Sequence, residues 1–373
     1  MSKTVIELSK TLLAKFRTIK GRVRGRIAAT PEVIATEVAQ LAQVVPGESW
    51  ITPIGGRAFD FLLDGEYHIA LTIEMGDDQL DAILHEGENW LKPISLPGAT
   101  FLYVADKLNL QPTLTDPQAV EEFIEGPANE DGVLLTTLID HLDRHQVFCL
   151  AKPVDDAALL FKKASHFYVA NYICTFDKAL LFRNRLTTNA LIQIREFFLE
   201  EKEQLFVENL FYAMSTPLLP HAFLEIYRTL EFAFVLPRAS SLLKRIDGSG
   251  KLGLRILDFA RVCHQELGWK RVERDALQRL FSDYIDQGRA AFVQICISCE
   301  PFNKLVPPGV TSDAKEQQGF MNDFVDVYYK LRNQVAHQFW ADEIKKCTDA
   351  DWQALIEFTL RCALHIYNKH LIK

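Results

Sequence analysis

Residues 320–337 read FMNDFVDVYYKLRNQVAH, and their apolar side chains recur at intervals of three and four residues. This spacing puts the apolar side chains on one face of an α-helix, where other helices can bury them. The face consists of Phe320, Phe324, Val327, Leu331 and Val335. The stretch therefore predicts a long helix that belongs to a helical bundle.

Comparable apolar stripes recur through the C-terminal half of the chain, where strand signals nearly vanish beyond about residue 187. They consist of Phe223, Ile226, Tyr227, Leu230 and Phe234; of Leu277, Leu280, Phe281 and Tyr284; and of Trp352, Leu355, Ile356, Leu360 and Ala363. Pro301 and the run Pro307-Pro308-Gly309 predict a loop over residues 300–318, because proline cannot continue a helix. We therefore expect an all-α helical-bundle domain over residues 188–373.

The N-terminal half has a different residue pattern, in which glycine turns separate short runs of β-branched and aromatic residues. These runs predict strands at Ser49–Ile54, Ala58–Leu63, Tyr67–Ile73, Thr100–Val104, Val147–Ala151 and Phe167–Thr175. Short turns such as Asp64-Gly65 favour an antiparallel sheet. Helices are expected over residues 1–20, from Pro31 onward, and at Val133–His145 and Asp155–Ala164. The predicted fold class is α+β, with a mixed helix and sheet domain over residues 1–187 before the helical domain.

Composition limits the class of protein. Of the 373 residues, 48% are hydrophobic and 24% are charged, which is the balance of a globular protein rather than a disordered or fibrous one. No run of about 18 apolar residues occurs, so a membrane-spanning helix is not expected. The seven cysteines are an odd number on a long chain without a secretory leader, which favours a cytoplasmic protein with reduced thiols.

The first 30 residues are strongly basic, although the chain has a net charge of −8. Their only acid is Glu7, and their basic residues are Lys3, Lys10, Lys15, Arg17, Lys20, Arg22, Arg24 and Arg26. A basic arm can contact phosphates, and Arg22, Arg24 and Arg26 are its candidate RNA contacts. The alternatives are the solvated face of an amphipathic first helix and an organellar transit peptide.

The candidate chemistry lies at the C-terminal end of residues 320–337. Asn333 and His337 are four residues apart and share a helix face, and the long Arg332 side chain is one step round that face. Arginine offers a fork of donors that matches phosphate oxygens, and histidine can move protons near neutral pH. Together they suit RNA cleavage without a metal, in which the ribose 2′-hydroxyl attacks its own phosphodiester. On residue types alone, a surface arginine and a buried histidine remain an alternative.

Arg332-Asn333-Gln334-Val335-Ala336-His337 resembles the R-x(4–6)-H signature of HEPN domains, including the variant with a polar residue after the arginine. The setting is similar too, because the motif ends a late helix of an all-helical domain and one helix, over residues 351–369, follows. The aromatic-rich segment over residues 223–231 resembles the opening helix of the family. The likeness covers about residues 190–373.

This resemblance implies an endoribonuclease in which two copies of the helical domain form one composite site as a homodimer. Arg332 would bind the scissile phosphate, His337 would transfer protons or position the phosphate, and Asn333 would orient both. Glu231 and Arg228 are candidates for supporting polar contacts. The resemblance also implies an RNA substrate, no cofactor or metal, and a role as an antiviral or toxin effector regulated by a ligand or protein at the N-terminal domain. The alternative is a catalytically silent HEPN module for binding or dimerisation.

Other motifs are interpreted as structural. Gly248-Ser249-Gly250-Lys251-Leu252-Gly253 matches a dinucleotide fingerprint, but the residues before it indicate a helix rather than the required strand. The pairs Cys296/Cys299 and His141/His145 lack the further ligands that zinc needs. The acidic stretch over residues 74–88 lacks the ligand order of a calcium loop and is expected to form solvated turns.

Overall fold

Asp64 and Gly65 form the two-residue turn of a β-hairpin in this computed structural model. Their φ angles are 53° and 75°, the positive values that a type I′ turn requires and that an Asp-Gly pair favours. The turn joins strand β2 (Arg57–Leu63) to strand β3 (Glu66–Thr72), and it pairs Phe61 with His68. The predicted hairpin is therefore confirmed.

The structure describes residues 4–21, 25–28, 31–86, 91–96, 98–126, 131–150, 166–177, 180, 185–199, 207–247, 255–266, 273–309, 312–337 and 347–371. The chain divides into a first unit, Met1–Ala179, and a second unit, Leu180–Lys373. This division falls a little before the predicted boundary between residues 187 and 188.

A five-stranded antiparallel sheet forms the centre of the first unit, with the strand order β1-β2-β3-β5-β4. The strands not yet introduced are β1 (Val45–Ile51), β4 (Leu91–Ile94) and β5 (His145–Leu150). All four pairings in the sheet are antiparallel, as the glycine turns predicted. Each residue of this sheet therefore shares a face with its cross-strand partner.

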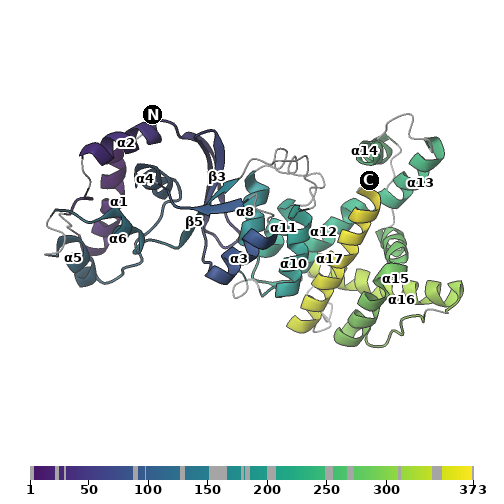
Figure 1. The fold of residues 1–373 in the computed structure, drawn as a ribbon. Helices are drawn as coiled ribbons and strands as arrows, with labels where there is room; N and C mark the ends of the chain where they lie inside the picture. The colour runs from purple at the N-terminus through teal and green to yellow at the C-terminus, as the bar shows by residue number, and fades with distance from the viewer. Residues whose placement is uncertain are drawn as a thin grey trace. The chain divides into compact units, whose positions relative to one another are not determined.

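Helices cover both faces of the sheet (Figure 1). One side carries α1 (Val5–Lys20), α2 (Pro31–Leu41), α4 (Gly98–Lys107), α5 (Pro117–Glu125) and α6 (Leu135–Ile139), and the other carries α3 (Asp77–Glu86) and α8 (His166–Cys174). The predicted first helix is confirmed, and its Leu8, Leu12 and Phe16 are buried in a core with Phe59 and Phe61 of β2. A capping box between Thr4 and Glu7 starts this helix.

Several N-terminal elements differ from the predictions. Thr100–Val104 and Phe167–Thr175 were expected as strands, but the first lies in helix α4 and the second in helix α8 up to Cys174. A short buried apolar run has no periodicity that separates strand from helix. Of the predicted helix Val133–His145, only Leu135–Ile139 is helical, as α6, and β5 begins at His145. Asp155–Ala164 lies outside the described residues.

The acidic stretch is also not a set of turns, because Asp77–Glu86 forms helix α3. Asp77 and Asp78 occupy its first turn, where the helix dipole favours negative charge. The Gln79 side chain accepts from the Gly76 amide at 2.8 Å, which satisfies one backbone donor at this helix start.

The described part of the second unit is all-helical, as predicted. Its helices are α10 (Thr188–Leu199), α11 (Val207–Ser215), α12 (Leu219–Ala233), α13 (Leu236–Ile246), α14 (Ile256–Glu266), α15 (Glu273–Ser298), α16 (Ala314–His337) and α17 (Asp349–Leu371), with a short 3-10 turn at Glu300–Phe302. Helix α17 packs against α10, α12 and α15 (Figure 1). The fold is thus α+β, and none of its described helices combines a bilayer-spanning length with an apolar composition.

An aromatic core joins α12, α15, α16 and α17. Phe281 packs edge-on against Phe324 and Tyr328, with ring centroids 5.5 and 5.0 Å apart. The buried Tyr328 hydroxyl is 2.5 Å from the Thr359 hydroxyl of α17. Because this polar pair is satisfied inside an apolar core, it fixes the rotation of α16 about its own axis.

Candidate functional site

Helix α16 carries the candidate motif on its last turns. The Asp313 side chain accepts from the Lys315 and Glu316 amides, both at 2.8 Å, and so caps the start of the helix. The predicted loop before it is therefore shorter than expected, because the helix begins at Ala314. The buried face consists of Phe320, Met321, Phe324, Val325, Tyr328 and Leu331. Val327 and Val335, expected on this face, are half-buried at its margin.

Arg332 follows this face and turns its guanidinium toward α12 and α15 rather than toward solvent. Its Nη2 donates to Glu231 Oε1 at 2.6 Å, and its Nε lies 3.2 Å from Glu273 Oε1. The contact with Glu273 is electrostatic, because Nε has no hydrogen-bond partner. Only 18% of the Arg332 side chain is exposed. Arg332 therefore ties three helices together.

Tyr227 of α12 contacts both Arg332 and Glu273. The guanidinium carbon of Arg332 lies 5.2 Å from the centre of the Tyr227 ring, within cation–π range. The Tyr227 hydroxyl donates to Glu273 Oε1 at 2.5 Å. Burial and the hydrogen bond to Glu273 both raise the pKa of Tyr227, so its hydroxyl stays protonated and keeps this bond at neutral pH.

The neighbours of Arg332 keep its guanidinium protonated. Burial lowers the pKa of Arg332, but the hydrogen bond to Glu231 and the charge of Glu273 outweigh burial, so the pKa is raised overall. Its Nη1 also donates to the Asn333 side chain at 3.1 Å. Among the described residues, the hydrogen bonds of Arg332 use one of the two N–H groups on each Nη atom.

His337 is the last residue of α16 and its side chain is exposed. The structure thus separates the two ends of the motif by environment, since Arg332 is embedded and His337 faces solvent. Asn333 shares the helix face with His337, as expected from the spacing of four residues, and contacts Arg332. A buried core histidine, the alternative at this position, is wrong.

The two supporting residues expected on α12 separate in the structure. Glu231 contacts Arg332 directly, whereas Arg228 pairs with Glu225 on its own helix at 2.6 Å. Glu273 and Tyr227 were not expected in the site. Tyr227 was assigned only to the apolar stripe, and Glu273 offered no signal beyond being an acid at the start of a helix.

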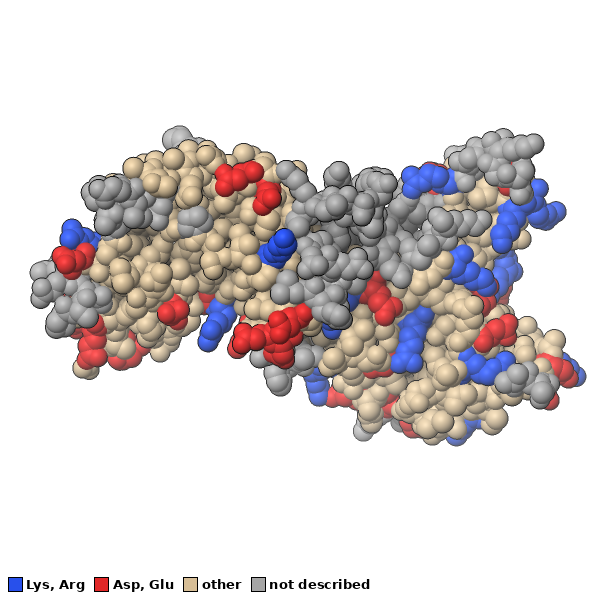
Figure 2. Space-filling model, in the orientation of Figure 1, with Lys and Arg blue, Asp and Glu red and all other residues tan. Residues whose placement is uncertain are grey.

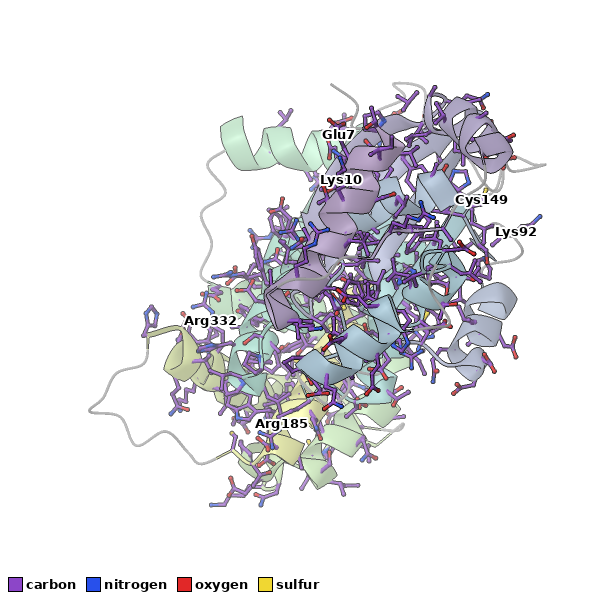
Figure 3. All side chains as sticks on the ribbon, turned by 90° about the vertical axis from the view of Figure 1, so that its left-hand side faces the viewer. Glu7, Lys10, Lys92, Cys149, Arg185 and Arg332 are labelled. Carbon is purple, nitrogen blue, oxygen red and sulfur yellow. The ribbon has the colours of Figure 1, made fainter. Side chains whose placement is uncertain are left out.

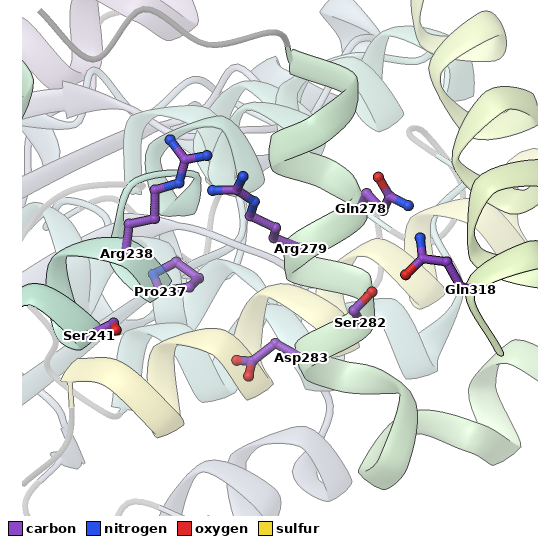
Figure 4. A pocket seen from close by; sticks show the side chains of 8 residues that line it. All are labelled: Pro237, Arg238, Ser241, Gln278, Arg279, Ser282, Asp283 and Gln318. Carbon is purple, nitrogen blue, oxygen red and sulfur yellow. The ribbon is translucent and has the colours of Figure 1, made fainter. Parts of the chain in front are cut away.

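The same unit contains a pocket of about 560 Å³ whose lining includes Arg238, Ser241, Arg279 and Ser282. The guanidinium groups of Arg238 on α13 and Arg279 on α15 turn toward one another across it (Figure 4). Basic side chains gather on the visible face of the second unit around α13 and α15 (Figure 2). Paired guanidiniums with nearby hydroxyls form a surface suited to phosphate oxygens.

Asp283 also lines this pocket, but two basic residues of α17 engage it. Lys369 Nζ donates to its Oδ1, and His370 Nε2 lies 3.1 Å from its Oδ2. Burial raises the pKa of Asp283, but the hydrogen bonds from His370 and Lys369 outweigh burial and lower it to about 2. The carboxylate is thus ionised and paired at neutral pH.

The basic N-terminal residues that the structure describes are partly engaged in the first unit. Lys15 Nζ donates to the Leu110 carbonyl at 2.7 Å, and Lys20 pairs with Glu121. Arg26 is exposed, and its Nε donates to the Asp131 carbonyl at 3.2 Å. Arg22 and Arg24 lie outside the described residues.

The motifs interpreted as structural have different outcomes. The glycine-rich segment at residues 248–253 lies outside the described residues, although the helix predicted before it is confirmed by α13. Cys296 and Cys299 are buried free thiols. His141 lies in a turn and His145 begins β5, so these two are not on one helix end.

Comparisons with protein-family models, curated proteins and solved structures found no match to this chain.

Proposed function

We propose that this chain is a metal-independent endoribonuclease of the HEPN type, in which the Arg332–His337 end of α16 acts on RNA. The observation that carries the proposal is that one helix presents both a fixed cation, Arg332, and an exposed histidine, His337, five residues later. The motif ends α16 of an all-helical unit, and α17 follows it, which is the setting that the HEPN resemblance implies.

The two side chains would divide the chemistry between them. The described contacts of Arg332 use one N–H on each Nη atom, and through the others the guanidinium would stabilise the charge that develops on the scissile phosphate. The exposed His337 would accept the proton of the ribose 2′-hydroxyl or donate one to the leaving oxygen. Attack by the 2′-hydroxyl would leave a 2′,3′-cyclic phosphate.

A single motif supplies one arginine and one histidine. We therefore propose that two copies of the second unit pair to complete the site, and that the chain works in the cytoplasm as a homodimer. A role as a toxin or antiviral effector, with the first unit as its regulatory part, follows from the same resemblance.

A silent HEPN module is the second candidate, and one observation favours it. Arg332 already has two carboxylates, Glu231 and Glu273, so it has a structural role as a link between helices whether or not RNA binds. In that case the chain would bind or dimerise without cleaving.

Incubation of the purified full chain with mixed RNAs in excess EDTA separates the two candidates. The nuclease predicts cleavage that persists in EDTA, leaves cyclic phosphate ends and is lost in His337→Ala. His221→Ala is the matched control, because it removes an exposed histidine from α12. Cleavage that is abolished by EDTA and restored by magnesium would overturn the mechanism, and no cleavage by the wild type would favour the silent module.

A further inference from the structure

Three side chains with different donor atoms meet on one face of the sheet in the first unit. His68 of β3 and Cys149 of β5 are cross-strand partners, and Glu66 lies two residues before His68 on the same face. Their ligating atoms all lie within 4.8 Å of one another. In the part of the chain that the structure describes, no other group of three histidine, cysteine or acidic residues comes together in this way.

The ring of His68 is fixed by two contacts. Its Nδ1 is 3.0 Å from the Glu66 carbonyl, which can only accept, so the proton sits on Nδ1 and Nε2 keeps its lone pair. The ring also stacks on Phe61, with centroids 5.1 Å apart and planes 15° apart. A histidine whose second nitrogen donates to a backbone carbonyl is the usual arrangement around a metal-bound imidazole.

A hydrogen bond joins the Cys149 thiol to the Glu66 carboxylate, and a metal could replace the proton of this bond. Cys149 Sγ donates to Glu66 Oε2 across 3.3 Å. Burial and Glu66 raise the pKa of this thiol to about 11, so it is protonated at neutral pH. A metal that bound both side chains would release the thiol proton to solvent and take the position between sulfur and oxygen.

The surroundings make the cluster reachable. His68 and Cys149 are 4% and 7% exposed, whereas Glu66 is exposed, so an ion would enter from the side of Glu66. Lys92 of β4 is the other cross-strand partner of Cys149, and Figure 3 shows these two side by side at the sheet edge. Lys92 is exposed, so water screens its repulsion of a cation.

We propose that Glu66, His68 and Cys149 form a zinc site, with a fourth position left for water or another ligand. A thiolate, an imidazole and a carboxylate are the donors that Zn²⁺ takes, whereas calcium and magnesium take oxygen donors. The ligands lie on two adjacent strands joined by backbone hydrogen bonds, so little ordering is needed on binding. Zinc would cross-link β3 to β5 and stabilise the first unit by mass action.

Equilibrium dialysis of the full chain against Zn²⁺ tests the proposal, with Cd²⁺ as a spectroscopic probe of thiolate ligation. The wild type should bind one ion per chain and show a thiolate-to-cadmium charge-transfer band in the ultraviolet. Glu66→Gln should weaken zinc at least about 10-fold, since even an outer-shell partner is worth that much. Cys149→Ser should remove the cadmium band.

The controls keep the outcome independent of folding. Glu66 is exposed, so Glu66→Gln should fold like the wild type by circular dichroism. Cys174→Ala removes a buried thiol of α8 in the same unit and should leave the cadmium band unchanged. Zinc should also raise the melting temperature of the wild type more than that of Glu66→Gln. No zinc binding, a band that survives Cys149→Ser, or equal zinc affinity in Glu66→Gln would overturn the proposal.

Discussion

Arg332 donates from Nη2 to Glu231 Oε1 across 2.6 Å, so the residue expected to bind phosphate is already paired with a carboxylate from another helix. How much of the guanidinium charge these carboxylates leave for a phosphate matters for the proposed chemistry. With Glu273 also in contact, removal of the guanidinium would leave two carboxylates facing one another between α12 and α15. Arg332 therefore contributes to folding as well as to the proposed cleavage.

The pair can be tested from its acidic side. Glu231→Gln keeps the shape of the side chain but removes the charge, so the unfolding free energy should fall by about 0.5–1.5 kcal/mol. Asp286→Asn is the control, because Asp286 is largely exposed and pairs at 4.0 Å with Arg289 on its own helix, so it should change stability by less than about 0.5 kcal/mol. Urea denaturation measures both, and equal effects would contradict a special role for the Arg332–Glu231 pair.

Stability in acid should depend on Asp283. Its folded-state pKa of about 2 is below the value of an unfolded aspartate, so its pairing with His370 and Lys369 stabilises the fold fully above about pH 4. This contribution is lost as the pH falls from about 4 to about 2. The stability difference between wild type and Asp283→Asn in urea should therefore shrink over that range. A difference that does not change with pH would contradict this assignment.

The pocket arginines should contribute to RNA binding through phosphate contacts. In Arg238→Gln/Arg279→Gln, loss of two such contacts should reduce the slope of log affinity against log salt by about 1.4, since a single strand gives about 0.7 for each contact. Lys304→Gln, an exposed change in the same unit, should leave the slope unchanged. Filter binding at several salt concentrations measures the slopes.

The N-terminal arm offers a second source of phosphate contacts. Arg22→Gln/Arg24→Gln/Arg26→Gln should weaken RNA binding and flatten its salt dependence by about 2.1 on the same basis. An unchanged slope would show that this segment is a solvated helix end, the alternative derived from its sequence. The described contacts of Lys15 and Lys20 within the first unit already show that part of this charge has a structural use.

The sequence predicts the fold best where local chemistry decides it. The Asp64-Gly65 turn and the capped first helix follow from residue preferences within a few positions. Thr100–Val104 has the composition of a strand, yet it forms part of α4, where all of its side chains except that of Tyr103 are buried. For a short run of this kind, tertiary burial outweighs β-propensity.

The candidate site shows the same division. The helical spacing of Arg332, Asn333 and His337 could be predicted, because all three lie on one helix. Glu273 could not, since its position against Arg332 depends on how α15 packs. The proposed zinc ligands are still harder to predict from the sequence. Glu66 and Cys149 are 83 residues apart, and only the register between β3 and β5 brings them together.

The last prediction separates catalysis from folding. His337→Ala removes an exposed side chain, so the unfolding free energy should stay within about 0.5 kcal/mol of the wild type. Cleavage should fall at least about 100-fold, the usual scale for a lost proton-transfer group.

Two companion variants give the contrast. Leu331→Ala, on the buried face of α16, should cost about 2–5 kcal/mol through cavity formation and reduce activity mainly by reducing the folded fraction. Arg332→Ala should lower stability by about 1–3 kcal/mol, because it leaves Glu231 and Glu273 without their cation. It should also abolish cleavage by the fraction that remains folded. Thermal melts beside an RNA gel distinguish these patterns. If His337→Ala cleaves as fast as the wild type, the histidine has no part in the reaction, and the nuclease mechanism proposed for α16 is wrong.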